Sequence, residues 1–499
     1  MESKSIFSGG SASPDFNFSS PAVLNLLQNK KIDFVGTATS DFQAEPLTYD
    51  KNGDPVITND WELEVMKNLN GKKSGIQTPQ TLSTFPSFFG NKHLYVKRSR
   101  EIGQNMFRFS LDFGRLCPNE GDFNAKLMAE YVSTLAHIKA QGQEPMLTIY
   151  HWPMPCYLIK TNNDGIIETG GWENADVIKH FRFYIESVVK FLSDETQVRN
   201  VLQSEGFTKQ FQDQVISEGL VQYFITVNEP ESVLLPGYMV GLFPPYKKGR
   251  IDLMIKVLNR MVEAHQIATN CLKEGLRNQS GKVKVSVAHA WPYFDGLLGD
   301  FAHSLINNLI ANRFEKGSEQ SDFLSLQYYF RMSVPTFTRS NKLFMEHPYF
   351  SEVYPKGILE NLKRMSFQYP GKEIFISEFG FSETEDKLRP FLSMETVRYI
   401  FEAMDQGVQV KGILLWSLVN NLEWAWGMEQ RFGLFHEHEL KTPLKHSEPG
   451  TIQGWEAWKA VADAITNPNE LTIKSLQSSY ETAKNQFHNV LASADRKAS

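Results

Sequence analysis

The stretch YFITVNEP, residues 223–230, decides the fold prediction for this chain. Its apolar and β-branched residues indicate a short buried strand, and the proline marks where that strand stops. Asn228 and Glu229 come at the carboxyl end of the strand, where barrels and open α/β sheets bind their ligands. The stretch IFISEFG, residues 374–380, has the same design and places Glu378 at the end of a second strand. Two carboxylates at two strand ends form a candidate acid/base pair for glycosidic bond cleavage, although a single glutamate in such a place is more often a solvated loop residue.

Strand-like runs alternate with amphipathic helical runs about eight times along the chain. This alternation predicts parallel strands, and eight repeats close into a barrel. We therefore predict an α/β fold, a (β/α)8 TIM barrel in a single domain with long βα loops. An N-terminal extension at 1–30 would precede the barrel at 31–469, and an amphipathic helical extension would follow at 470–499. The expected strands are 32–37, 105–110, 145–150, 222–227, 283–288, 323–327, 373–377 and 412–416, with helices at 125–140, 253–274 and 388–406 among those between them.

The composition is that of an ordinary globular protein, because 41% of the 499 residues are hydrophobic and 22% are charged. A net charge of −6 argues against a nucleic-acid partner, which would require a basic face. The cysteines, at 117, 156 and 271, form neither a disulfide framework nor a zinc pattern. The first residues lack an apolar signal segment and no run of 18 apolar residues indicates a membrane span, so we expect a cytoplasmic protein. The oligomeric state stays open.

Polar or aromatic residues follow nearly every expected strand, and together they predict a pocket at one end of the barrel. One such residue would carry little information, whereas a ring of them is typical of a binding site. The residues are Gln43, Arg108, His151 and Trp152, Asn228 and Glu229, Tyr328 and Tyr329, Glu378, and Trp416 with Glu423 and Trp424.

These motifs resemble those of glycoside hydrolase family 1, the retaining β-glycosidases. The resemblance extends roughly from residue 34 to residue 458. The motif TVNEP at 226–230 is similar to the family's acid/base motif, and ISEFG at 376–380 is similar to its nucleophile motif. Further similarities are FQAE at 42–45, RFS at 108–110, HW at 151–152, WSL at 416–418, NLEW at 421–424 and RFG at 431–433.

Several positions depart from the family pattern. Phe379 and Gln327 stand where the family has Asn, and Asn420 and Leu422 stand where it has Asp and Phe. Phe113 replaces a Trp and Pro46 replaces a Gly, and the polar segment 193–220 is longer than the family requires. None of these changes removes a catalytic carboxylate, but they leave the sugar preference open.

The resemblance implies a double displacement in which Glu378 is the nucleophile and Glu229 is the acid/base. It also implies that Arg108 and Tyr329 keep Glu378 ionised. The residues expected to bind the sugar are Gln43, His151, Asn228, Trp416, Glu423, Trp424 and Phe432. No cofactor is expected, since the chain lacks a Gly-rich phosphate loop. The run HEHE at 436–439 suggests a metal site at first, but it lacks a third ligand nearby, so we expect an exposed loop and no metal.

The expected partner is a small-molecule glycoside with a terminal neutral β-linked sugar, of the glucoside or galactoside type, which the enzyme would hydrolyse. A transglycosylase with the same carboxylates, or a carbohydrate-binding barrel with little turnover, are the alternatives. Because Glu423 would carry a negative charge, we expect poor turnover of 6-phosphorylated sugars. In the last segment, Leu476, Tyr480, Ala483, Phe487 and Val490 recur at helical spacing, so we expect a helix that packs on the barrel or on a second subunit.

Overall fold

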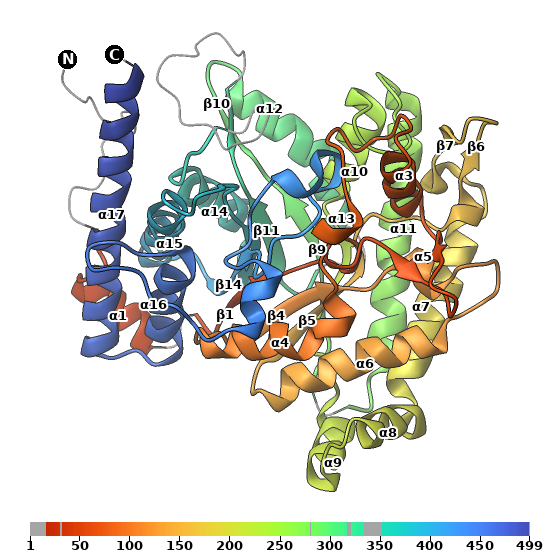
Figure 1. Ribbon diagram of the computed structural model, residues 1–499, viewed down its shortest axis with the longest axis horizontal. Coiled ribbons are helices and arrows are strands. Elements are labelled where there is room, and N and C mark those ends of the chain that lie inside the picture. The colour runs from red at the N-terminus through yellow and green to blue at the C-terminus, as the bar shows by residue number, and fades with distance from the viewer. Residues whose placement is uncertain (1–15, 30–31, 280, 317–320, 334–351, 499) are drawn as a thin grey trace.

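A computed structural model describes residues 16–29, 32–279, 281–316, 321–333 and 352–498 (Figure 1). Eight parallel strands form a closed barrel in the order β1-β14-β13-β11-β9-β8-β5-β4. The predicted TIM barrel is therefore confirmed, and the observed strand ends differ from the expected ones by at most two residues. The barrel strands are β1 (Phe34–Ala38), β4 (Met106–Ser110), β5 (Glu144–Tyr150), β8 (Tyr223–Asn228), β9 (Lys284–Ala290), β11 (Leu324–Tyr328), β13 (Ile374–Phe379) and β14 (Val410–Trp416).

Helices surround the barrel because each presents an apolar face to the strands. In α6 (Ala125–Ala140), Asn124 caps the first turn by accepting a hydrogen bond from the N–H of Leu127 at 3.0 Å. The buried side chains of α6 include Met128 and Leu135, and the helix packs on β5. The other long helices of this layer are α4 (Phe88–Glu101), α7 (Val177–Ser193), α11 (Ile251–Gly275), α14 (Gly357–Gln368), α15 (Arg389–Asp405) and α16 (Gly454–Thr466), together with the short α13 (Asn312–Glu315).

The loops that follow the strands carry shorter elements, and those that precede the strands are mostly compact. Figure 1 shows α3 (Asp60–Leu69), α10 (Pro230–Leu234) and α12 (Gly299–Ile306) in the upper half of the view, whereas α8 (Glu195–Ser204) and α9 (Lys209–Glu218) lie at the bottom. The short helices also include α2 (Asp41–Ala44) and α5 (Phe113–Leu116). Three small sheets pair β2 (Thr48–Tyr49) with β3 (Pro55–Val56), β6 (Lys160–Thr161) with β7 (Ile167–Thr169), and β10 (Tyr293–Asp295) with β12 (Arg331–Ser333). Single turns are η1 (Leu82–Thr84), η2 (Cys156–Leu158), η3 (Gly171–Glu173), η4 (Leu235–Val240), η5 (Asn307–Ala311), η6 (Trp424–Glu429) and η7 (Glu437–Lys441).

Aromatic side chains close the amino-terminal end of the barrel. Tyr223 and Phe375 come at the starts of β8 and β13, and their ring centroids lie 5.2 Å apart. Phe323 packs edge-on against Phe375 at 5.0 Å, and Phe34 from β1 joins the same cluster. Because large rings fill this end, a ligand has to approach from the carboxyl ends of the strands.

Helices near both ends of the chain, and a helical segment before β8, lie outside the barrel repeat. The helix α17 (Glu470–Ala498) packs on α15 and α16, and α1 (Pro21–Gln28) packs on α15 (Figure 1). The inward residues of α17 are buried, namely Leu476, Tyr480, Ala483 and Phe487, while Val490 is half-buried. The long segment before β8 forms α8 (Glu195–Ser204) and α9 (Lys209–Glu218), and α8 packs on α6 and α7. Across the described residues, no helix is both long enough and apolar enough to cross a membrane.

Candidate active site

Three side chains donate hydrogen bonds to Glu378 near the end of β13. Arg108 Nη1 lies 2.5 Å and Gln327 Nε2 lies 2.8 Å from Oε1, and Tyr329 Oη lies 2.6 Å from Oε2. Burial raises the pKa of Glu378, and the Arg108 cation with the three hydrogen bonds acts against that rise. Donors that bond to a carboxylate stabilise its ionised form, which is the form that a nucleophile needs.

The carboxyl group of Glu229 has a different environment. Glu229 is the first residue after β8 and has a left-handed backbone with a φ of 42°, which is uncommon for a residue with a Cβ. Its N–H donates to the carbonyl oxygen of Ala288 at 2.8 Å. Burial raises the pKa of Glu229 well above its usual value, and repulsion by Glu378 raises it further. A raised pKa favours the protonated form of the carboxyl group, which is the form that can donate a proton to a leaving group.

Arg108, on β4, links the nucleophile candidate to side chains on β5 and β8. Its Nη2 lies 2.6 Å from Oδ1 of Asn228, and its Nε lies 3.0 Å from Oγ1 of Thr148. Asn228 Nδ2 lies 3.1 Å from Nε2 of His151. Burial and the nearby Arg108 cation lower the pKa of His151 well below its usual value, so this imidazole is neutral. Neutral imidazole and amide groups suit the recognition of sugar hydroxyls because each can both donate and accept hydrogen bonds.

A second polar group forms beside the loop after β14. Nε2 of Gln43, on α2, lies 3.2 Å from Oε2 of Glu423, and the side chain of Trp416 also bonds to this carboxyl group. Gln43 Nε2 further donates to the carbonyl oxygen of Leu422 at 2.9 Å. These contacts hold the Glu423 carboxyl group beside Gln43 and Trp416.

We expected a negative charge on Glu423, and this prediction is wrong at neutral pH. Burial and the negative charge of Glu378 raise the pKa of Glu423 to about 8, although the hydrogen bonds from Trp416 and Gln43 oppose this rise. The group is therefore mostly protonated at pH 7. Burial is the reason for the difference, because a solvated carboxylate would not hold its proton.

Aromatic rings form the wall of the site. The Trp424 ring centroid lies 4.3 Å from that of Trp152 and 6.0 Å from that of His151. Phe432 packs edge-on against Tyr329 with centroids 5.9 Å apart. Trp152 and Trp424 have φ angles of 86° and 47°, so both resemble Glu229 in having strained backbones. Strained residues of this kind concentrate at functional sites, where the surrounding structure holds them in place.

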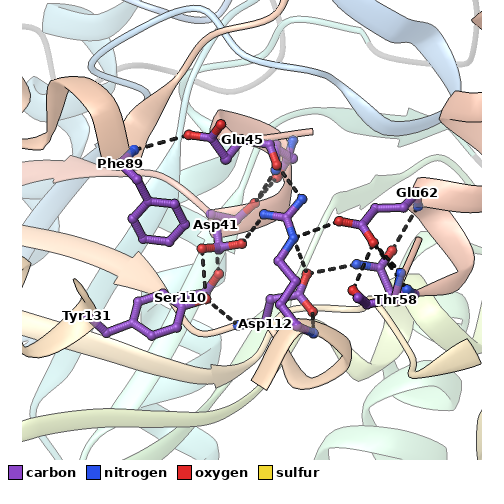
Figure 2. Close-up of polar contacts among 12 residues, drawn as sticks. Asp41, Glu45, Thr58, Glu62, Phe89, Ser110, Asp112 and Tyr131 are labelled. Atoms are coloured by element: carbon purple, nitrogen blue, oxygen red, sulfur yellow. Dashed lines mark hydrogen bonds and ion pairs between the residues drawn. The ribbon is translucent and has the colours of Figure 1, made fainter. Parts of the chain in front are cut away.

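A buried ion network centred on Arg115 lies beside α2, the helix that carries Gln43, and Figure 2 shows its members Asp41, Glu62 and Asp112. Arg115 Nη1 lies 2.5 Å from Oδ1 of Asp41, its Nε lies 2.8 Å from Oε1 of Glu62, and its Nη2 donates to the carbonyl oxygen of Glu45. Burial and the neighbouring carboxylates raise the pKa of Asp112 to about 8, despite the nearby Arg115 cation. The network therefore fixes both ends of α2, and with it the position of the Gln43 amide.

The structure brings all the predicted site residues together at the carboxyl ends of the strands. Sequence reasoning missed the role of Gln327, which was noted only as a departure from the family pattern. Gln327 Nε2 lies 2.8 Å from both Asn228 Oδ1 and Glu378 Oε1, so it bridges the two. Its place directly before Tyr328 and Tyr329 at a strand end was the available signal.

The run HEHE at 436–439 contributes to the turn η7 rather than to a fully exposed loop. His438 is exposed, whereas His436 is half-buried and lies 3.3 Å from the side-chain amide of Asn420. Within the described ranges, no group of three or more His, Cys, Asp or Glu side chains has the arrangement of a metal site.

Comparison with known proteins decides the family. The model of glycosyl hydrolase family 1 matches residues 31–208 and 310–447. The chain belongs to glycosyl hydrolase family 1. It is therefore a glycoside hydrolase of β-glucosidase-like type, although the matched segments leave out β8, β9 and Glu229.

The family 1 relatives are distant in sequence. Furcatin hydrolase from Viburnum furcatum is 25% identical, over 75% of this chain and 81% of its own length. A 6-phospho-β-galactosidase from Clostridium acetobutylicum is 23% identical, over 83% of this chain and 94% of its own. The crystal structure of a β-glucosidase from Pyrococcus furiosus superimposes with a TM-score of 0.71 at 19% identity, covering 91% of this chain and 98% of that one.

Proposed function

We propose that this protein hydrolyses terminal, neutral β-linked sugars with net retention of anomeric configuration. The observation that carries the proposal is the unequal environment of two buried carboxyl groups. Glu378 accepts hydrogen bonds from a cation, a phenol and an amide, whereas Glu229 is shielded from solvent and repelled by Glu378. Two carboxyl groups whose surroundings separate their proton affinities can serve as nucleophile and acid at one pH.

In the first step, Glu378 attacks the anomeric carbon while Glu229 protonates the departing glycosidic oxygen. A glycosyl ester forms on Glu378 and the aglycone leaves as an alcohol. In the second step, the Glu229 carboxylate removes a proton from water, which attacks the anomeric carbon and releases Glu378. The enzyme returns to its starting protonation state, and two inversions give net retention.

The proposed sugar contacts follow from the two polar groups of the site. Asn228, whose amide is already oriented by Arg108 and Gln327, would contact the 2-hydroxyl, where hydrogen bonds strengthen in the transition state. His151 would bind the next hydroxyl along the ring. The rest of the sugar would be bound by five further residues, Gln43, Glu423, Trp416, Trp424 and Phe432.

The preference for a neutral sugar rests on the groups around Glu423. Gln43 and Trp416 bond to Glu423, and neither carries a charge. A phosphate placed there would lose its hydration without gaining a cation, which is costly. A relative that is named a 6-phospho-β-galactosidase makes this preference worth measuring directly.

Transglycosylation uses the same carboxylates, with a sugar or alcohol replacing water in the second step. Product analysis with an added acceptor distinguishes the two reactions. A binding barrel with little turnover is the third possibility, and the three donors on Glu378 argue against it because they serve a nucleophile.

The test is to incubate the enzyme with an aryl 2-deoxy-2-fluoro-β-glycoside and to map the modified peptide. We expect a covalent adduct on Glu378, and NMR should find the β-anomer as the first product of an ordinary aryl β-glycoside. An inverted first product, or an adduct on another residue, would refute the assigned nucleophile.

A further inference from the structure

His289 lies between two buried carboxylates, and one of them, Glu231, comes two residues after Glu229 in the chain. At the end of β9, its Nδ1 is 2.8 Å from Oε1 of Glu231, and its Nε2 is 3.3 Å from Oε1 of Glu315. The three side chains are at most 5% exposed. A neutral imidazole has only one N–H, so only the imidazolium can donate to both carboxylates at once.

The surroundings are consistent with a charged His289. Burial acts to lower the pKa of His289, but Glu231 and Glu315 outweigh it and raise the pKa to about 10. Glu315 has further support, since Ser321 Oγ donates to its Oε1 at 2.8 Å and Lys372 Nζ lies 3.8 Å from its Oε2. Two carboxylates thus face two cations, so the cluster is close to neutral as a whole.

This cluster is connected to Glu229 through the backbone. Glu231 lies in the first turn of α10, two residues after Glu229, and its second oxygen accepts a hydrogen bond from the N–H of Ala290 at 3.2 Å. Glu229 itself donates its N–H to Ala288. Residues 229 and 231 are therefore both fixed to residues 288–290 of β9. A left-handed backbone at a residue with a Cβ persists only where its surroundings hold it, and these contacts supply that restraint.

We propose that the Glu231–His289 pair is a positioning device for the acid/base Glu229, which holds its backbone turn and sets the charge beside its carboxyl group. The inference rests on the proposed function of Glu229 as acid/base. Glu231 and His289 do not touch the sugar in this proposal. They act through Glu229, with Glu315, Ser321 and Lys372 as outer support.

The charged and titratable groups near this pair come from several elements. The charges of Glu378 and Glu231 raise the pKa of Glu229, and the charge of Arg108 lowers it. Burial raises the pKa of Tyr369, which follows α14, and the charges of Glu315 and Glu231 raise it further. Because Glu231 is a like charge that raises the pKa of Glu229, removing that charge should let Glu229 lose its proton at lower pH.

The variant Glu231→Gln tests the proposal because it removes a charge and keeps the shape. The new amide oxygen can still accept from Ala290, and His289 keeps Glu315 as its other carboxylate partner. We expect the basic limb of the kcat/KM profile to move to lower pH, while the acid limb stays in place. On aryl glycosides with poor leaving groups kcat should fall about 10- to 100-fold, and on activated ones it should change little, because acid catalysis matters most for a poor leaving group.

The variant His289→Gln leaves the Glu231 carboxylate without its cation and should give a larger loss on poor leaving groups. His265→Gln is the matched control, since His265 is also buried and its ring lies 5.9 Å from Phe314, compared with 5.8 Å for His289. We expect this control to lower the melting temperature without moving the basic limb.

The proposal is overturned if Glu231→Gln keeps the wild-type basic limb and the wild-type leaving-group dependence. It is also overturned if His265→Gln shifts the basic limb as much as Glu231→Gln does. Trapping with the 2-fluoro glycoside separates this result from failure of the proposed function. If wild type forms the Glu378 adduct, the proposed function holds and the variants judge only the Glu231–His289 pair. If wild type forms no adduct, the proposed function itself fails.

Discussion

The phenolic oxygen of Tyr329 lies 2.6 Å from Oε2 of Glu378, opposite the oxygen that Arg108 holds. A hydrogen bond to a charged acceptor contributes about 1.5–3 kcal/mol. We expect Tyr329→Phe to lower kcat/KM roughly 10- to 150-fold, at about 1.36 kcal/mol per tenfold. Loss of the donor should raise the pKa of Glu378, so the acid limb of the pH profile should move to higher pH.

Tyr328→Phe is the control for that experiment. The Tyr328 hydroxyl donates to the carbonyl oxygen of Tyr354 at 2.5 Å, and so it bonds to no carboxylate. Its removal should leave the acid limb unchanged. An acid limb that stays in place in Tyr329→Phe would mean that Tyr329 does not keep Glu378 ionised.

Replacing Glu229 by Gln should reveal its dependence on the leaving group. We expect a loss of about 100- to 10,000-fold for glycosides with poor leaving groups, the range of general acid catalysis. Activated aryl glycosides should lose far less in the first step, because their departing oxygen needs little protonation. Steady-state and burst kinetics on a series of aryl glycosides provide the measurement, and equal losses across the series would rule out the acid role.

The Arg115 network should contribute strongly to stability. Arg115→Met leaves buried carboxylates without their cation, and breaking a buried ion pair in this way costs about 3–5 kcal/mol. We expect the melting temperature to fall by several degrees and KM to rise, because α2 carries Gln43. Arg199→Met is the control, since Arg199 pairs with Glu195 and Asp213 at the surface and its loss should leave both quantities nearly unchanged.

Selection against 6-phosphorylated sugars should depend on pH. Below pH 8 the Glu423 carboxyl group is mostly protonated and does not repel a phosphate. Binding is then opposed only because the groups bonded to Glu423 include no cation to pair with the phosphate. Above pH 8 the carboxylate repels it by up to about 4 kcal/mol at close range. The ratio of kcat/KM for paired aryl glycosides without and with the 6-phosphate should therefore rise through pH 8, and Glu423→Gln should flatten that rise. Equal or better turnover of the phosphorylated member would contradict the proposed preference.

The packing of α17 predicts that its inward face stabilises the barrel. Phe487 is buried against Phe391 with ring centroids 4.6 Å apart, and Tyr480 donates to Oε2 of Glu395 at 2.7 Å. Phe487→Ala should cost about 3–5 kcal/mol, whereas Leu471→Ala, at a side chain 77% exposed, should cost little. Truncation after Asn469 should lower the melting temperature further, and a truncated protein that melts like wild type would show that the contacts contribute nothing.

The barrel could be predicted from sequence because each strand is a short apolar run that is buried on both faces. The two carboxylates were predictable for the same reason, since Glu229 and Glu378 interrupt such runs at their ends. The protonation of Glu423 could not be predicted, because burial is a property of the whole site. The contact between Glu231 and His289 was equally inaccessible, since the two residues are 58 positions apart and a lone histidine after a strand gives no signal. The double contact of Gln327 depends on a register shift between β11 and β13 that no local pattern encodes.

The turn between α8 and α9 has a practical consequence. These helices precede β8, so they lie at the end of the barrel opposite the strand termini that carry the carboxylates (Figure 1). Gly206 in this turn is exposed, and a side chain built there would meet open space. A linker inserted at this turn would let the enzyme be immobilised on a solid support with its substrate entrance facing the solution.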